Sequence, residues 1–404
     1  MNPLVITDIQ TRRHFLGTLL AAAAGSPRRL HATSPNNLDA LASTEKVMHD
    51  FVVNRMMDGD GLCRSCLCAA TGAPWTNADL AKTDQRLITD MFQNSPDKAG
   101  CMSYENALMA TGEFAVSQIV RHRVTNDAAA RELAHRAIHA ILAVIEEGRH
   151  YMPGWLPKPF GGLRNVRNSH EMSTDQYTKA IVALHAWRPL ASKDEQMAID
   201  RFFVDAADFF VARKFRHAYR HRTIVTADSH RHALGLFVPL VVLAAKTFSD
   251  AGYRKHLTAF SAAMDASLQD EGLANFNMTS LMVEGYHVAM QAGLDDPRLP
   301  QTIKTLWQRG AKRVDTNGDA YEDGRPPRKD SQGTRLAAIA TIAELLDPAT
   351  RATELASKIL ARQSDPRKMT HTRLPESIAE VAITSWLVAY WRLREWALRD
   401  APKS

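Results

Sequence analysis

Short turns and long polar loops alternate along this chain, and that alternation constrains its fold more than any other feature. Good helix formers dominate the sequence, whereas alternating runs typical of β-strands are scarce. Helices are predicted near residues 38–57, 84–93, 103–123, 127–148, 174–188, 193–215, 229–247, 251–268, 278–291, 298–313, 333–346, 348–362 and 376–398. Short turns are expected at 123–127, 188–192, 249–252, 293–299 and 346–350. Longer polar loops are expected at 149–172, 216–228, 269–277 and 314–332.

The pattern predicts an all-α fold in which about six helical hairpins surround a ring. The short turns would then gather on one side, and the long loops on the other, where the inner helices start. Functional residues tend to lie on such loops, so we expect the site on the long-loop side. An open helical solenoid is the competing architecture, although the sequence has no clean period of the solenoid kind. Ser173, followed three positions later by Gln176, has the pattern of a capping box at the start of one inner helix.

Polar and aromatic side chains cluster near the predicted starts of the inner helices. Carboxylates supply the acid and base of glycoside cleavage, and aromatic rings stack on sugars, so this composition suits a sugar-binding cleft. The candidate catalytic residues are Glu171, Asp175, Asp228, His230, Glu284, Tyr286 and His287. The candidate substrate-binding residues are Tyr104, Glu105, Trp155, Gln176 and Asn277.

Each carboxylate also has a structural interpretation. Asp175 and Asp228 could simply cap helices, because acidic groups at a helix start complement its dipole. Glu171 could be solvated or paired with an arginine. Glu284 lies within an apolar helical segment, where a carboxylate needs either a partner or a catalytic role.

The hairpin layout and the segment His170–Tyr177 (HEMSTDQY) resemble the six-hairpin glycosidase superfamily, the (α/α)6 toroids. That superfamily includes glycoside hydrolases and polysaccharide lyases, many of them exported. The layout of hairpins resembles the superfamily over most of the chain, whereas the residues themselves resemble it only in short segments. It implies an all-α (α/α)6 toroid that keeps catalytic groups at the starts of its inner helices, here Glu171, Asp175 and Asp228.

Three functions follow from this interpretation. The first is a glycoside hydrolase that acts on an oligo- or polysaccharide through paired carboxylates. The alternative is a polysaccharide lyase, in which a Tyr or His base such as His230, Tyr286 or His287 acts on a uronate-containing polymer, with Tyr104 and Asn277 as further candidates. The third is a non-catalytic sugar-binding or helical interaction protein. Product analysis separates hydrolysis from elimination.

The four cysteines are Cys63, Cys66, Cys68 and Cys101. In an exported protein, disulfides are the first interpretation of such a cluster. A bound metal or iron–sulfur cluster is the alternative, but the spacing matches no common cluster motif, and we expect no required cofactor. The pairs Glu284/His287 and His135/His139 have helical spacing for shared metal ligation, but single pairs of this kind are weak signals.

The segment that starts at Asp315 resembles the front of a calcium-binding loop. Oxygen-bearing side chains recur at alternate positions, as a hard cation requires. The proposed ligands are Asp315, Asn317, Asp319 and Asp323. The segment departs from the EF-hand pattern because Ala320 replaces a glycine and Pro326 stands in place of the last glutamate. The sequence therefore predicts either a structural calcium site or an acidic surface turn.

The N-terminus carries Thr11–Gly17 (TRRHFLG) and an Ala/Leu run, which resemble a twin-arginine export signal. The apolar run is far shorter than the roughly 20 residues that span a bilayer. We therefore expect residues 1–32 to be a signal read by the twin-arginine translocase, and residues 33–404 to form one toroid domain in the periplasm or outside the cell. No later segment is predicted to be a stable membrane span.

The charge of the chain gives weak support for nucleic-acid binding. The whole chain has a net charge of +6, but residues 1–32 hold four arginines and one aspartate, so the remainder carries +3. We therefore predict a carbohydrate partner and no nucleic acid. Substrate identity lies beyond the sequence.

Overall fold

Residues 38–83, 95–219, 223–249, 252–269, 275–322, 329–372 and 374–400 are described by a computed structural model. The predicted signal (1–32) and the predicted helix at 84–93 lie outside these residues. The division into a signal and one mature domain therefore stays a prediction.

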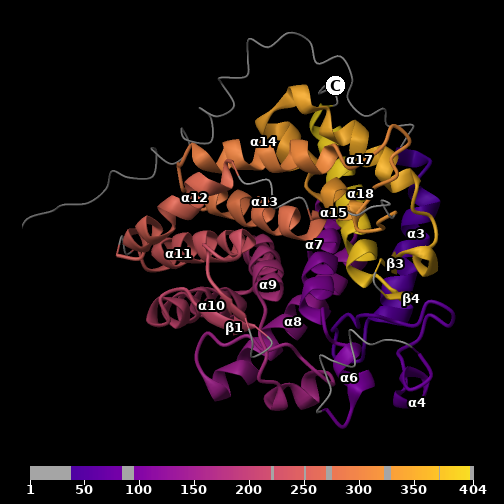
Figure 1. Cartoon of the computed structure of the whole chain (residues 1–404), viewed down its shortest axis with the longest axis horizontal. Helices are drawn as coiled ribbons and strands as arrows, with labels where there is room; N and C mark the ends of the chain where they lie inside the picture. The colour runs from indigo at the N-terminus through magenta and orange to yellow at the C-terminus, as the bar shows by residue number, and fades with distance from the viewer. Residues whose placement is uncertain are drawn as a thin grey trace, which may run out of the picture.

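Among the described residues, six inner helices form a closed ring (Figure 1). They are α7 (Ala107–Thr125), α9 (Thr174–Trp187), α11 (Leu234–Phe248), α13 (Phe276–Gln291), α15 (Gly333–Ala338) with its continuation α16 (Ala340–Leu346), and α18 (Glu380–Asp400). Each contacts the next in this order, and α18 returns to contact α7. The closed order of contacts excludes the open solenoid.

An outer helix or helical segment precedes each inner helix along the chain. These are α3 (Ala42–Phe51) with η1 (Val52–Met56), α8 (Ala128–Tyr151), α10 (Lys193–Ala212), η5 (Arg254–Phe260) with α12 (Ser261–Ser267), α14 (Arg298–Ala311) and α17 (Ala352–Ala361). Short turns lead from inner to outer helices, and long connections lead from outer to inner ones, as predicted. The indigo α3 contacts the yellow α18 in Figure 1, so the first and last hairpins meet.

Local sequence explains several helix boundaries and contacts. Ser192 and Glu195 form a complete capping box at the start of α10. Helices α11 and α13 approach so closely that a Cβ on Gly285 would collide with the carbonyl of Gly235. A side chain at either position would force these inner helices apart.

The predicted capping box at Ser173 is not formed. Ser173 is the N-cap of α9, but its side chain caps no backbone group. Gln176 instead donates from Nε2 to the carbonyl oxygen of Glu105 at 2.6 Å, across to the chain that leads into α7. The tertiary hydrogen bond replaces the local one that the spacing predicted.

The long connections carry the remaining small elements. Helices α4 (Asn77–Leu80) and α6 (Lys98–Met102) lie between η1 and α7. Strands β1 (His217–Tyr219) and β2 (Thr223–Val225) pair antiparallel before α11, and β3 (Thr370–His371) and β4 (Leu374–Ile378) pair before α18. The sequence prediction began the last helix too early, because residues 374–378 extend as a strand.

Helix α11 is the most apolar helix among the described residues. The segment Arg231–Phe248 is long and apolar enough to cross a membrane by length and composition, but 72% of it is buried inside the protein. Its apolar side chains contribute to the core of the ring, which accounts for its composition.

Candidate functional site

Polar side chains from the starts of three inner helices meet on the long-loop side of the ring. Asp175 lies in the first turn of α9, Asn277 in the first turn of α13, and Arg335 in α15. Asn277 donates from Nδ2 to Asp175 Oδ2 at 3.2 Å, and its Oδ1 accepts a hydrogen bond from Arg335 Nη1. The amide therefore fixes the carboxylate of Asp175 relative to a buried cation.

Asp175 is half-buried and remains ionised. Burial alone raises the pKa of its carboxyl group, but the charge of Lys158, that of His232 when its ring is protonated, and the hydrogen bond from Asn277 outweigh burial. The pKa is lowered as a result, so the group is a carboxylate at neutral pH. A carboxylate of this kind can accept a proton or attack an electrophilic carbon.

Asp330 is a second carboxyl group at the same side of the ring, and the sequence analysis missed it. It lies just before α15, it is buried, and its Oδ1 accepts a hydrogen bond from Gln332 N at 2.9 Å. Burial raises the pKa of Asp330, opposed by that hydrogen bond and by the charge of Arg335. The pKa of Asp175 is thus lowered and that of Asp330 is raised. Opposite shifts of this kind are typical of a catalytic base paired with a catalytic acid. The place of Asp330 at the start of an inner helix is the sequence signal that could have identified this residue.

Lys158, in the loop before α9, lies between two acidic side chains, Glu105 and Glu171. It is almost fully buried; its Nζ donates to Glu105 Oε1 and lies 3.9 Å from Glu171 Oε2. Burial lowers the pKa of the Lys158 ammonium, but Glu105, Tyr219 and Glu171 outweigh burial and raise it. Glu105 and Glu171 therefore hold a structural cation, and Lys158 also contributes positive charge near Asp175.

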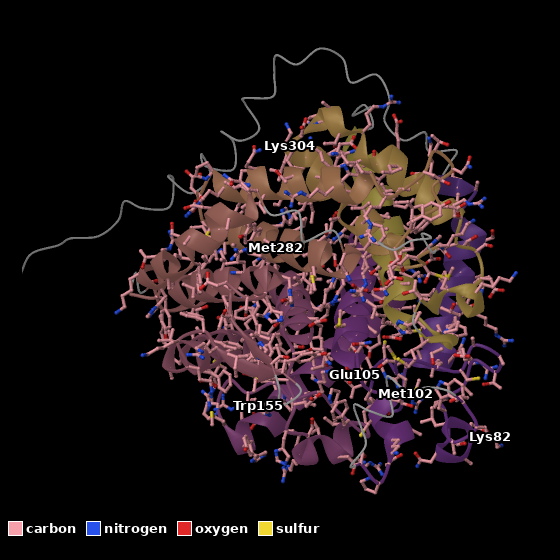
Figure 2. The ribbon with its side chains drawn as sticks, viewed as in Figure 1. Lys82, Met102, Glu105, Trp155, Met282 and Lys304 are labelled. Carbon is pink, nitrogen blue, oxygen red and sulfur yellow. The ribbon has the colours of Figure 1, made fainter. Side chains whose placement is uncertain are left out.

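A pocket of about 490 Å³ opens between the loop that precedes α9 and the β1–β2 hairpin. Its lining residues are Trp155, His170, Glu171, Met172, Phe209, Arg213, Arg216, His217, Ala218 and Ile224. The lining combines an indole ring with two guanidinium groups, a chemistry that suits an anionic sugar. Figure 2 shows Trp155 and Glu105 in the lower half of the view, near β1 and α6, whereas Lys304 of α14 lies near the top.

His217 connects this pocket to the start of α9. Its Nε2 lies 3.1 Å from Thr174 Oγ1, directly before Asp175. Burial lowers the pKa of His217 to about 4, so the imidazole is neutral at physiological pH. A neutral imidazole there can hydrogen-bond to a ligand without adding charge to the pocket.

Tyr104 and Gln176 support the site instead of lining the pocket. Tyr104 donates its hydroxyl to Asp58 Oδ2 at 2.9 Å, and burial together with Asp58 raises the pKa of Tyr104 to about 12. Gln176 is buried and bonded to the Glu105 carbonyl. Both side chains are occupied by protein contacts, which corrects the expectation that they bind substrate directly.

Glu284 belongs to a buried ion network inside the ring, which corrects the expectation that it faces the loops. Lys179 Nζ lies 2.8 Å from Glu113 Oε1 and also contacts Glu284 Oε2. Arg392 Nη1 donates to Glu284 Oε1 at 2.9 Å. Burial raises the pKa of Glu284, but Lys179 and Arg392 outweigh it and keep the group ionised. The partner that a buried carboxylate requires is therefore present.

Tyr286 and His287 lie farther along α13 than Asn277 does. His287 is ten residues from Asn277, about 15 Å along the helix axis. Tyr286 is fully buried, and burial raises the pKa of its phenol. His287 is held by Gln291 at 2.9 Å, and burial lowers its pKa to about 4. Neither residue joins the group around Asp175, because the helical rise carries both away from the long-loop side.

Asp228 and His230 lie in the connection before α11. The side chain of Asp228 is 82% exposed and its nearest cationic atom is Arg231 Nη1 at 3.8 Å. His230 Nδ1 lies 2.9 Å from Ser229 Oγ, and its ring meets that of His232 edge to face. The structure therefore brings His232, and not Asp228, toward Asp175.

All four cysteines are free thiols, so the disulfides expected from the sequence are not formed. Cys66 is the one whose sulfur lies beside a histidine, His371. Within the described ranges, two groups bring three possible metal ligands together: Cys66 with His371 and Glu380, and His135 with His139 and Glu195. The second group lies on the outer helices α8 and α10, where both histidines are well exposed.

The loop that resembles a calcium site is held by protein donors. Asp315 Oδ1 accepts hydrogen bonds from the backbone N–H groups of Asn317 and Asp319, each at 2.9 Å. Asp319 accepts from Lys329 Nζ at 2.9 Å and from Arg362 Nε at 3.0 Å. These contacts close the turn and neutralise Asp319 without a metal ion.

Calcium binding at this loop stays a prediction, and Asp323 lies outside the described residues. Because two cations already neutralise Asp319, we expect any affinity to be no tighter than about millimolar. Calorimetric titration of EGTA-treated protein with calcium measures it. Saturable micromolar binding that is lost in Asp319→Asn would contradict this expectation.

The architecture is similar to solved structures at low sequence identity. An unsaturated glucuronyl hydrolase mutant from Streptococcus agalactiae matches with a TM-score of 0.51 and 13% identity, over 97% of this chain and 96% of that chain. A D-mannose isomerase matches with a TM-score of 0.51 and 9% identity, over 91% of this chain and 99% of that chain. A polysaccharide lyase matches with a TM-score of 0.49 and 10% identity, over 80% of this chain and 100% of that chain.

The fold is an (α/α)6 toroid. This confirms the fold class predicted from the alternation of turns and loops. No protein-family model matches the sequence, and no curated protein sequence matches it. Because a hydrolase and an isomerase share this architecture, the fold alone does not define a reaction, and the reaction depends on the residues of the site.

Proposed function

We propose that this protein is an exported glycoside hydrolase that uses Asp175 and Asp330 as its catalytic carboxyl groups. The observation that carries the proposal is their opposite environments on one side of the ring: Asn277 links Asp175 to Arg335, and the charge of Arg335 also acts on Asp330. Asp330, with its raised pKa, would protonate the leaving glycosidic oxygen. Asp175, with its lowered pKa, would act as the base for water or as the nucleophile.

The pocket that His217 connects to the start of α9 supports a carbohydrate ligand. Trp155 offers a ring on which a sugar can stack, and Arg213 and Arg216 offer charge for a carboxylate or sulfate group. The same arginines also favour a second candidate function, that of a polysaccharide lyase. Elimination from a uronate requires its carboxylate to be neutralised, and an arginine can do this. Of the bases expected from the sequence, His230 is the one that lies before an inner helix and beside His232, whose charge acts on Asp175.

Product analysis distinguishes these reactions. The wild-type protein is incubated with uronate-containing and neutral oligosaccharides, and reducing ends and ultraviolet absorbance are followed together. The proposal expects new reducing ends without a gain of absorbance. A gain in absorbance from a new C4–C5 double bond would establish elimination instead, and a loss would indicate hydrolysis of an unsaturated uronide, the activity in the name of the Streptococcus agalactiae protein. No product from any substrate would favour a binding protein.

The two carboxyl groups predict a bell-shaped pH dependence of kcat/KM. Activity should rise as Asp175 ionises below its ordinary pKa of 3.8, and fall as Asp330 loses its proton above that value. Asp330→Asn should lower kcat/KM by about 10²- to 10⁴-fold and remove the alkaline limb from the residual activity. An unchanged alkaline limb in this variant would assign the acid to another group.

We also propose that the twin-arginine segment directs the folded protein to the periplasm or beyond, through the twin-arginine translocase. Arg12 and Arg13 support this, and they lie outside the described residues. Replacing both with lysine should leave the protein in the cytoplasm, as cell fractionation would show. Export that continues unchanged would contradict this role.

A further inference from the structure

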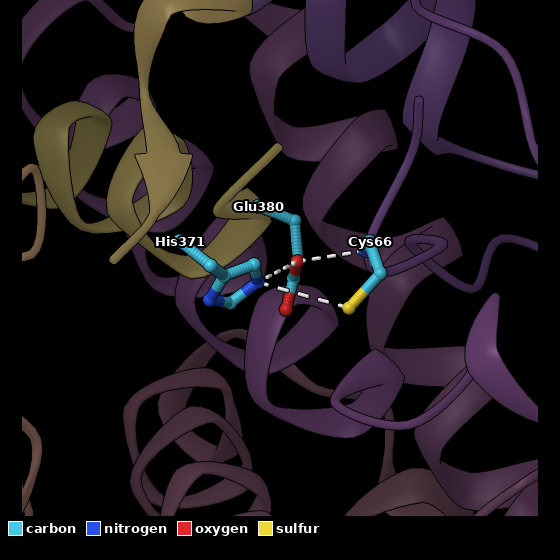
Figure 3. A group of neighbouring side chains, drawn as sticks. All are labelled: Cys66, His371 and Glu380. Carbon is cyan, nitrogen blue, oxygen red and sulfur yellow. Dashed lines mark hydrogen bonds and ion pairs between the residues drawn. The ribbon is translucent and has the colours of Figure 1, made fainter. Parts of the chain in front are cut away.

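Three side chains from distant parts of the sequence converge at the start of α18 (Figure 3). Cys66 comes from the loop after η1, His371 from β3, and Glu380 is the first residue of α18. Cys66 Sγ lies 3.7 Å from His371 Nε2, and the same nitrogen lies 3.3 Å from Glu380 Oε2. All three possible ligand atoms lie within 4.8 Å of one another.

These separations match those around a tetrahedral zinc ion. Zinc binds sulfur at about 2.3 Å and nitrogen or oxygen at about 2.0–2.2 Å. Tetrahedral angles then place sulfur and nitrogen about 3.6 Å apart, and nitrogen and oxygen about 3.4 Å apart. The observed 3.7 and 3.3 Å differ from these values by little, so a single ion can contact the three atoms with small movements.

A catalytic Cys–His–Glu triad fits the geometry less well. In such a triad the histidine accepts the thiol proton on one ring nitrogen and is oriented by the carboxylate through the other. Here Cys66 and Glu380 both approach Nε2 of His371. Convergence on one nitrogen is expected when the lone pairs of all three residues point at a common centre.

Surrounding groups hold two of the three side chains in place. Glu380 Oε2 accepts a hydrogen bond from Cys66 N at 2.8 Å, and Glu380 Oε1 accepts one from Asn106 Nδ2 at 3.0 Å. Glu380 is fully buried and Cys66 is 3% exposed, whereas the side chain of His371 is 18% exposed. The buried ligands are therefore positioned in advance, and an ion can reach them from the side of His371.

We propose that Cys66, His371 and Glu380 form a zinc site with three protein ligands and a fourth position for water or a ligand oxygen. Thiolate, imidazole and carboxylate together select zinc, and three protein ligands with one open position are typical of reactive zinc sites. Binding forms bonds from zinc to the sulfur, nitrogen and oxygen ligands, displaces water from the aqueous ion, and releases the proton of the Cys66 thiol to solvent. The site differs from the four-cysteine cluster considered in the sequence and does not depend on the proposed hydrolase activity.

Zinc stoichiometry tests the proposal. All proteins carry His139→Gln, which disables the exposed group on α8 and α10, and are purified without a histidine tag. After incubation with zinc and dialysis, elemental analysis should find about one zinc per chain in this background. Cys66→Ser and His371→Gln should each reduce the zinc content at least tenfold. Cys101→Ser is the matched control, because Cys101 contacts Ser95 and lies outside the group, and it should keep its zinc.

Cobalt substitution gives a readout in the parent protein itself, whether or not the Cys66 and His371 variants fold. The His139→Gln protein loaded with cobalt should show a thiolate-to-cobalt charge-transfer band, which Cys101→Ser keeps and Cys66→Ser loses. The proposal is overturned if the folded His139→Gln parent binds less than a tenth of an equivalent of zinc (about the adventitious level), or if its cobalt form lacks the thiolate band. Equal zinc content in Cys66→Ser and its parent would overturn it as well.

Discussion

Replacing Asp175 with asparagine is expected to lower kcat/KM by about 10²- to 10⁴-fold while leaving the fold intact. The amide is isosteric with the carboxylate and retains an oxygen that can accept the hydrogen bond from Asn277. It cannot take up a proton or attack carbon, so the loss should appear in kcat. The measurement is steady-state kinetics on the oligosaccharide that the wild-type protein cleaves fastest.

Asp194→Asn is the matched control for this substitution. Asp194 is also an aspartate in the first turn of a helix, but it is exposed at the start of α10, which follows a short turn. If helix capping were the main role of Asp175, both variants would lose a little stability and keep their turnover. Full activity in Asp175→Asn would show that this carboxylate is not catalytic.

Lys179→Met is expected to destabilise the protein by about 3–5 kcal/mol, because it removes from the core the cation that contacts both Glu113 and Glu284, of which Arg392 contacts Glu284. The methionine fills a similar volume, so the loss arises from charge and not from a cavity. Thermal and denaturant unfolding measure the effect.

The double variant Lys179→Met/Glu113→Gln separates charge from packing. It removes one charge of each sign, keeps the Glu284–Arg392 pair, and leaves an amide to accept from Thr384 and Ser385. It should recover a large part of the lost stability. Lys193→Met, at an exposed lysine of α10, should change stability by no more than about 0.5 kcal/mol. Equal destabilisation in the single and double variants would show that the network's charges contribute little.

The ring could be predicted from the sequence because connection length carries topological information. Turns such as 123–127 and 188–192 are too short to do more than reverse the chain, so each defines a hairpin. The strands β3 and β4 were missed because residues 376–378 read as the start of the last helix, although β4 extends over them. Its strand conformation depends on pairing with β3, which helix propensity does not describe.

The site could be predicted in part. Asp175 and Asn277 were found because each lies at the start of an inner helix. Glu284 was misplaced because a buried carboxylate signals a partner as readily as a catalytic role, and its partners, Lys179 and Arg392, come from other helices. His371 and Glu380 were missed for the related reason that their link to Cys66 spans more than 300 positions in the sequence.

A crystal structure of Asp175→Asn with its bound oligosaccharide tests the central claim most directly. The sugar is the one that the wild-type protein cleaves fastest. We predict a glycosidic bond on the long-loop side of the ring, within hydrogen-bonding reach, about 3.2 Å, of the substituted side chain, and with Trp155 and Arg213 beside the adjoining sugar. A sugar bound at the short-turn side, or anywhere remote from Asp175 and Asp330, would contradict the account.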